Sequence, residues 1–105
     1  MAVSIEWHPR AIADLREIAA FIARDSESRA AHAVNDIVGV VDRLSTFPRS
    51  GRIVPEFDDP SIRQRTWKDY RIIYSIEPGP RESVIVLAVV HGFRRLEDAL
   101  GLDLK

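Results

Sequence analysis

Cysteine is absent from the 105-residue sequence, and no long apolar run occurs in it. Without cysteine the chain has no disulfide, no thiol nucleophile and no cysteine-ligated zinc or iron site. A membrane helix needs about 18 consecutive apolar residues, which the sequence lacks, and the N-terminus lacks the basic start and apolar core of a signal peptide. We therefore expect one cytoplasmic domain spanning residues 1–105, without membrane association.

An excess of charge of one sign is also missing, because 15 Lys and Arg residues balance 16 Asp and Glu residues. This balance excludes a broadly basic nucleic-acid-binding surface. The charges are unevenly distributed: residues 1–60 carry 7 basic and 10 acidic side chains, whereas residues 62–95 carry 7 basic and 3 acidic ones. Most of the basic residues are Arg, whose forked guanidinium suits bidentate binding of carboxylates or phosphates. The second half therefore suits an acidic protein partner or a polynucleotide backbone.

The first half of the chain predicts one strand followed by two helices. Apolar and polar residues alternate over residues 3–7, and Pro9 allows a helix to begin directly afterwards. Apolar residues then recur at spacings of three and four over residues 10–24 and again over about 27–45. Two amphipathic helices with so short a break between them form a hairpin.

The second half predicts three strands after a long loop. Residues 48–61 contain three of the six prolines and form the loop. Strand signals follow at 62–67, 70–76 and 84–91, and their close spacing predicts an antiparallel meander. The last segment is apolar on both faces, as in a central strand. The predicted α+β fold is β-α-α-β-β-β, with the N-terminal strand and the helix hairpin packed on a small, mostly antiparallel sheet.

The connection at Lys68-Asp69 decides which arginines share a face of this sheet. If these two residues form a two-residue turn, Arg65 pairs with Ile72, and Arg71 points to the opposite side. A loop with an odd number of residues would instead gather Arg65 and Arg71 on one face.

Five short motifs occur in order on the predicted elements. They are Trp7-x-Pro9-x-Ala11, Asp14-Leu15-x-x-Ile18, Leu44-x-x-Phe47-Pro48-x-x-Gly51-Arg52, Tyr70-Arg71-Ile72-Ile73-Tyr74 and Val90-His91-Gly92-x-Arg94. Together they resemble the RelE/ParE superfamily of toxins from type II toxin-antitoxin systems, over nearly the whole chain. The resemblance implies a compact domain that inhibits growth and forms a hetero-oligomer with a cognate, acidic and partly disordered antitoxin.

The superfamily contains two functional types. RelE-like members resemble endoribonucleases that cut mRNA on the ribosome, whereas ParE-like members inhibit DNA gyrase. In a nuclease, Arg71 and Arg94 would stabilise phosphate charge, and His91 would act as acid or base without a metal. The late Tyr or His of such nucleases has no match, because residues 96–105 contain neither.

This missing residue favours a ParE-like toxin that binds DNA gyrase and is not an enzyme. ParE-like members also carry a two-residue turn at the position of Lys68-Asp69, which favours the split arrangement of the arginines. Four basic residues are then candidates for target binding: Arg63, Arg65, Lys68 and Arg95. The alternatives are a ribosome-dependent mRNA endoribonuclease and a degenerate member that has lost toxicity.

The three histidines and the aromatic residues also have structural interpretations. The histidines include no pair at ligand spacing, so we expect neither a metal nor a cofactor. His91 is then a structural residue, hydrogen-bonded to a neighbouring strand or helix. Trp67, Tyr70 and Tyr74 could stack on bases, but under a helix hairpin they are expected in the core.

Overall fold

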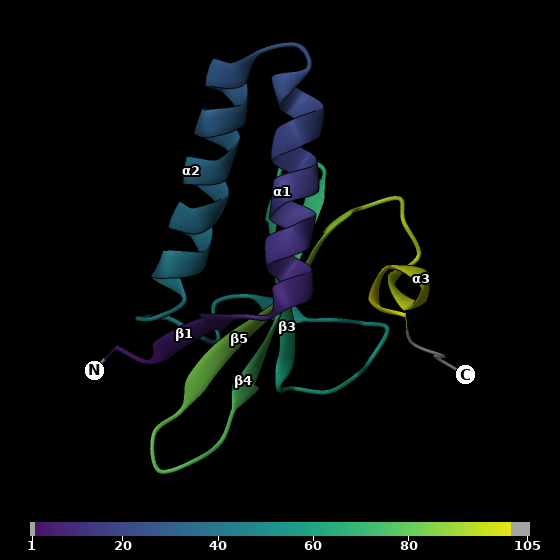
Figure 1. Ribbon diagram of the computed structural model, residues 1–105. Coiled ribbons are helices and arrows are strands. Elements are labelled where there is room, and N and C mark those ends of the chain that lie inside the picture. Colours follow the sequence, from purple (N-terminus) through teal and green to yellow (C-terminus); the bar gives the residue numbers. More distant parts are fainter. Residues whose placement is uncertain (1, 102–105) are drawn as a thin grey trace.

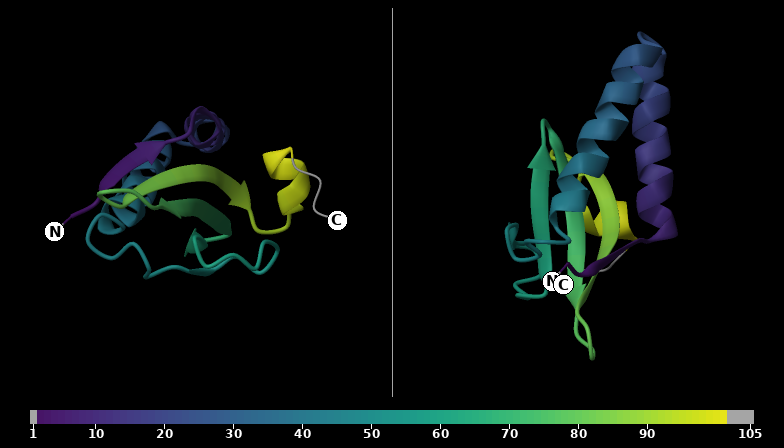
Figure 2. Two further views of the ribbon diagram at one scale, coloured as in Figure 1. Left: turned by 90° about the horizontal axis from the view of Figure 1, so that it is seen from below. Right: turned by 90° about the vertical axis from the view of Figure 1, so that its left-hand side faces the viewer.

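A helix hairpin lies on one side of a five-stranded sheet in the computed structural model, which describes residues 2–101 (Figure 1). The element order is β1 (Ser4–Trp7), α1 (Pro9–Ala23), α2 (Glu27–Arg43), β2 (Arg52–Ile53), β3 (Ile62–Trp67), β4 (Tyr70–Glu77), β5 (Ser83–His91) and α3 (Leu96–Leu100). The far end of the hairpin extends beyond the strands, as Figure 2 shows from the side. None of the helices within residues 2–101 is long and apolar enough to cross a membrane.

The strand order is β1-β5-β4-β3-β2, with β1 parallel to β5 and all other neighbours antiparallel. The predicted α+β class, the hairpin and the antiparallel meander are therefore confirmed. The prediction missed β2, whose two residues pair with Gln64 and Arg63 of β3 inside the segment expected to be a plain loop. Two residues are too few to show the alternation by which a strand is recognised.

The two helices of the hairpin, α1 and α2, each begin with a side-chain cap. The Nδ1 atom of His8 accepts the backbone N–H of Arg10 at 3.0 Å, and the Oγ atom of Ser26 accepts that of Arg29 at 3.2 Å. Each cap satisfies a backbone donor that has no partner within the helix. Helix α2 ends at Arg43, slightly before the predicted end, because the next residues form tighter turns, such as Ser45 N–H to Asp42 O at 3.1 Å.

The two faces of the sheet are covered by different elements. The hairpin side buries a cluster that includes Ala11, Ile18, Ile37, Val41, Ile72, Val86 and Val89. The other side buries a cluster formed by Val54, Ile73, Ala88, Val90, Leu96, Ala99 and Leu100, which brings together the loop before β3 and helix α3. Strand β5 contributes to both clusters, so its predicted burial on two faces is confirmed.

A β-bulge interrupts the alternation of strand β5. Ile73 of β4 pairs with Ala88, whereas the next residue, Tyr74, pairs with Val86, so that Leu87 is an extra residue. The side chains after Leu87 therefore change sides relative to an unbroken strand. As a result Val89 shares the hairpin face with Val86.

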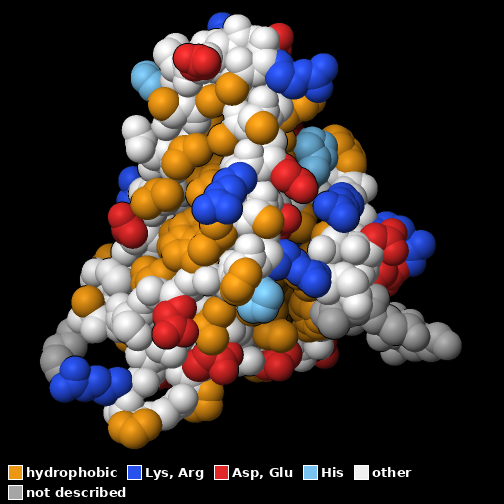
Figure 3. Space-filling view, viewed as in Figure 1, with side chains coloured by type: hydrophobic (Ala, Val, Ile, Leu, Met, Phe, Trp, Pro, Cys, Tyr) orange, Lys and Arg blue, Asp and Glu red, His pale blue; other side chains and the backbone are white. Residues whose placement is uncertain are grey.

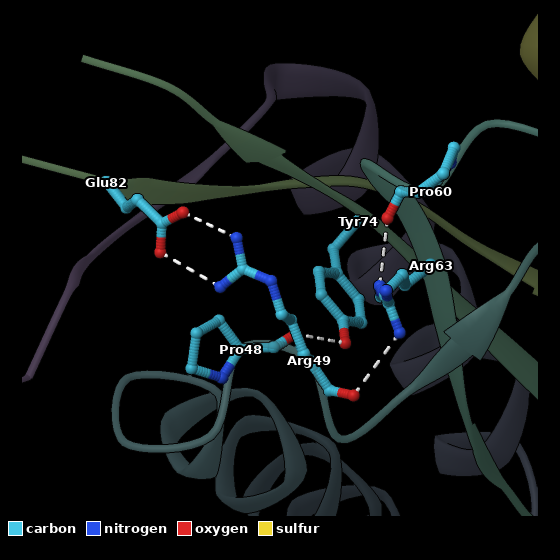
Figure 4. A network of polar contacts seen from close by, with 6 residues as sticks. All are labelled: Pro48, Arg49, Pro60, Arg63, Tyr74 and Glu82. Carbon is cyan, nitrogen blue, oxygen red and sulfur yellow. Dashed lines mark hydrogen bonds and ion pairs between the residues drawn. The ribbon is translucent and has the colours of Figure 1, made fainter.

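The loop between α2 and β3 is tied to the sheet by hydrogen bonds from Tyr74 and Arg63 (Figure 4). The Tyr74 hydroxyl donates to the carbonyl of Pro48 at 2.6 Å and accepts the N–H of Gly51 at 3.0 Å. The Arg63 guanidinium donates to the carbonyls of Pro60 at 2.9 Å and Gly51 at 3.1 Å. These bonds fix the start and the end of the loop against β3 and β4.

Candidate functional site

The strand register separates the arginines on which the functional alternatives depend. Arg65 pairs with Ile72 on the hairpin side of the sheet, whereas Arg71 pairs with Thr66 and faces the other side. Lys68 and Asp69 form the turn, and Lys68 has a left-handed φ of 51°. The split arrangement that a two-residue turn predicts is confirmed.

Arg63 and Arg65 share a face but differ in their surroundings. The Arg63 guanidinium is occupied by backbone carbonyls of the loop (Figure 4). Arg65 is half-buried and lines an open groove of about 570 Å³ with Arg52 and Thr66. Arg65 is thus placed where a partner can reach it, and target binding by either arginine stays a prediction.

Arg71 lies on the opposite face and is held by two side chains. Its Nε donates to Oε1 of Gln64 at 2.9 Å, and its two terminal nitrogens donate to the Glu56 carboxylate at 2.8 and 2.9 Å. The Arg71 side chain is only 15% exposed. These hydrogen bonds from Arg71 are the main cause that lowers the pKa of Glu56. The guanidinium therefore joins the loop to the sheet.

We expect Glu56→Gln to reduce the acid sensitivity of the fold. Because the pKa of Glu56 is lowered in the folded state, its contribution is present above the unfolded value of 4.5 and is lost as the pH falls through the folded pKa. The side chain is 36% exposed, so solvent screening limits the effect to about 1 kcal/mol. Urea unfolding at pH 7 and pH 3 measures it, with Glu77→Gln at the end of β4 as control. If the free energy of unfolding depended on pH in the same way in Glu56→Gln and wild type, the ion pair between Glu56 and Arg71 would not stabilise the fold.

His91 ends β5 on the hairpin side of the sheet. Its ring packs edge-on against Tyr70 of β4 at 5.4 Å between ring centroids, and its Nδ1 accepts the N–H of Phe93 at 3.2 Å. A structural hydrogen bond is therefore present, but the predicted partner on a neighbouring strand or helix is wrong. The bond is local because the chain turns sharply after His91 and returns the Phe93 N–H to the ring.

Arg94 lies near helix α1. There the Asp14 carboxylate accepts the N–H of Val89 at 2.9 Å, next to the bulge of β5. Burial raises the pKa of Asp14, while the Val89 hydrogen bond and the charge of Arg94 act in the opposite direction. Arg94 and His91 are thus on the α1 side, and Arg71 is on the other face. The three candidate nuclease residues are not brought together.

Asp14 is expected to stabilise the fold as an acceptor and not as a charge. Its raised pKa means that the ionised form is less favourable in the folded state, so that stability falls as the pH rises through 3.8 toward the folded value. Asp14→Asn keeps an acceptor for Val89 and should be neutral or stabilising at pH 7. Asp14→Ala leaves the N–H unpaired and should cost about 1–2 kcal/mol. Urea unfolding of both variants separates these roles, and equal losses would contradict the assignment.

Four rings form a band across the end of the sheet, and we call Trp67, Tyr70, His91 and Phe93 the aromatic band. Successive ring centroids lie 6.1, 5.4 and 5.1 Å apart. The prediction that all three aromatic residues lie in the core is confirmed for the buried Tyr74. Trp67 and Tyr70 are only half-buried. The sequence analysis did not identify Phe93 as a candidate binding residue. An apolar ring between Gly92 and two arginines, just after the last strand, could have indicated an exposed binding residue.

The basic side chains do not form one continuous patch on the face drawn in Figure 3, where they alternate with acidic ones. Lys68 lies at one end of the aromatic band, with its Nζ 5.0 Å from the centre of the Trp67 ring. Arg94 and Arg95 follow Phe93 at the other end, and Arg95 is paired with Glu97. Within residues 2–101 no three His, Asp or Glu side chains gather as a possible metal site.

A helix hairpin on one side of a twisted, mostly antiparallel sheet, with a short helix after the last strand, defines a small α+β domain with a RelE/ParE-like fold. The sequence model of the ParE toxin of type II toxin-antitoxin systems, parDE, matches residues 5–96. The chain therefore belongs to the ParE toxin family and is the toxin of such a module.

Solved structures share this fold at low sequence identity. A structure of the chromosomal ParDE toxin-antitoxin system from P. aeruginosa is 22% identical, with a TM-score of 0.69 over 86% of this chain and 96% of that one. The toxin-antitoxin complex RelBE2 from Mycobacterium tuberculosis is 19% identical, with a TM-score of 0.61 over 87% of this chain and 99% of that one. No curated protein sequence matches the chain.

Proposed function

We propose that this toxin inhibits growth by binding DNA gyrase and does not cleave RNA. The observation that carries the proposal is the placement of Arg71, which is held by Glu56 and Gln64 on the face opposite His91. Cleavage of RNA by its own 2′-hydroxyl requires a base, an acid and cations within reach of one phosphate. Groups on opposite faces of a sheet cannot meet that requirement, whereas a toxin that acts by binding has no such requirement.

We also propose that a cognate acidic antitoxin neutralises the toxin in a hetero-oligomeric complex. Two proteins of the same fold belong to toxin-antitoxin systems, the chromosomal ParDE system from P. aeruginosa and the RelBE2 complex from Mycobacterium tuberculosis. The local excess of basic residues over 62–95 suits an acidic partner on a chain that is close to neutral overall. A small acidic reading frame beside the gene would supply the partner for direct binding measurements.

A supercoiling assay tests the target. Purified toxin at micromolar concentration is expected to inhibit supercoiling by the gyrase heterotetramer, and addition of the antitoxin should restore it. The same preparation should leave mRNA intact in a cell-free translation reaction. Cleavage of the mRNA in that reaction, with normal supercoiling, would identify a ribosome-dependent nuclease instead. Inactivity in both assays, together with normal growth after induction of the toxin alone, would identify a degenerate member.

A further inference from the structure

The turn after β5 presents an aromatic side chain to solvent. The Phe93 residue is 91% exposed, more than any other large apolar residue within 2–101. Isolated apolar residues are common on protein surfaces, but this one is continuous with the His91, Tyr70 and Trp67 rings. A protruding ring at the end of an aromatic band indicates an interaction surface.

Backbone hydrogen bonds hold this turn in one conformation. The N–H of Gly92 donates to the carbonyl of Asp69 at 2.7 Å, which ties the turn to the β3–β4 connection. The N–H of Phe93 donates to Nδ1 of His91, and the N–H of Arg94 donates to the His91 carbonyl at 3.0 Å. The exposed ring is therefore preorganised, so that binding would cost little additional ordering of the chain.

Positive charges flank the band at both ends. Lys68 lies over the Trp67 ring, and Arg94 and Arg95 directly follow Phe93. Within residues 2–101, Arg94 forms no ion pair with a carboxylate. Aromatic and Arg side chains together are the residue types that contribute most of the binding energy in protein interfaces.

We propose that residues 91–95 are the surface through which the toxin docks on DNA gyrase, with Phe93 inserted into an apolar pocket of the gyrase protein that is rimmed by carboxylates. This inference rests on the proposed function. A convex, rigid side chain needs a preformed pocket, which a folded target offers, whereas a disordered antitoxin binds by covering grooves and strand edges. Arg94 and Arg95 then pair with the acidic rim.

Phe93→Ala tests this docking surface. We expect the toxin concentration for half-maximal inhibition of supercoiling to rise about 30-fold or more, as for the loss of a central interface aromatic. Phe47→Ala is the matched control, because Phe47 is 65% exposed but follows α2, outside the aromatic band. The control should inhibit like wild type. Phe93→Trp should keep most of the inhibition, since Trp also fills an apolar pocket.

A second variant and a second partner make the test specific. Arg94→Glu keeps the ring but reverses one charge, and it should weaken inhibition about 10-fold or more. Thermal unfolding and affinity for the antitoxin should stay at the wild-type level in Phe93→Ala. Equal inhibition by wild type and Phe93→Ala, or loss of antitoxin affinity alone, would overturn the docking surface and leave the proposed function intact. A wild-type toxin without effect on gyrase would overturn both.

Discussion

Gly51→Ala is expected to lower the free energy of unfolding by about 3 kcal/mol. A Cβ atom at this position would lie 2.5 Å from the carbonyl oxygen of Gln64 and 2.6 Å from the Tyr74 hydroxyl. Neither atom can move freely, since one belongs to the backbone of β3 and the other to a buried side chain that is hydrogen-bonded to Pro48. The loop would have to separate from the sheet to accept the methyl group.

Gly39→Ala is the matched control for this prediction. Gly39 lies within α2, and a Cβ atom there meets no other atom within 4 Å. Alanine is the better helix former, so this variant should gain about 0.5–1 kcal/mol. Urea unfolding followed by circular dichroism measures both variants. A loss below about 1 kcal/mol in Gly51→Ala would show that the loop does not pack closely on Gln64.

Tyr74→Phe is expected to cost about 2 kcal/mol, because it removes the partner of a buried backbone N–H and of a part-buried carbonyl. The hydroxyl satisfies both the carbonyl of Pro48 and the N–H of Gly51, and the Tyr74 residue has no exposed surface. Tyr70→Phe is the control, since the half-buried Tyr70 lies at the start of β4 next to the turn, and it should cost less than about 0.5 kcal/mol.

The pH dependence gives Tyr74 a second signature. Burial raises the pKa of its hydroxyl above the ordinary value of 10.0. The unfolded chain therefore ionises first as the pH rises, and wild type should lose stability above pH 10 that Tyr74→Phe does not lose. Unfolding at pH 9 and pH 11 compares the two proteins, and parallel losses would mean that the Tyr74 hydroxyl ionises equally well in the folded state.

Short-range patterns were sufficient to predict most of the fold. The helix hairpin follows from apolar spacing, and the pairing of Arg65 with Ile72 follows from the length of one turn. The separation of Arg65 and Arg71 could be predicted for the same reason, because parity along paired strands depends only on adjacent residues.

The remaining features depend on residues far apart in the chain. The partner of Arg71 is Glu56, in a loop whose course is decided by the contacts of Tyr74 with Pro48 and Gly51. Strand β2 exists because this loop runs alongside β3, and no local signal marks it. The exposed position of Phe93 depends on a turn anchored at Asp69, on a different strand connection.

The extra residue in β5 has a consequence for how toxins of this fold can diverge. Leu87 is the extra residue, and beyond it His91 projects toward the hairpin while Arg71 projects away from it. Deletion of the Leu87 codon would remove the bulge but leave Ala88 and the residues after it opposite their present partners, so His91 would still lie beside Tyr70 on the hairpin side. The bulge therefore lets β5 gain or lose one residue without moving its end, so that strand length can vary in this fold while Arg71 and His91 stay on opposite faces.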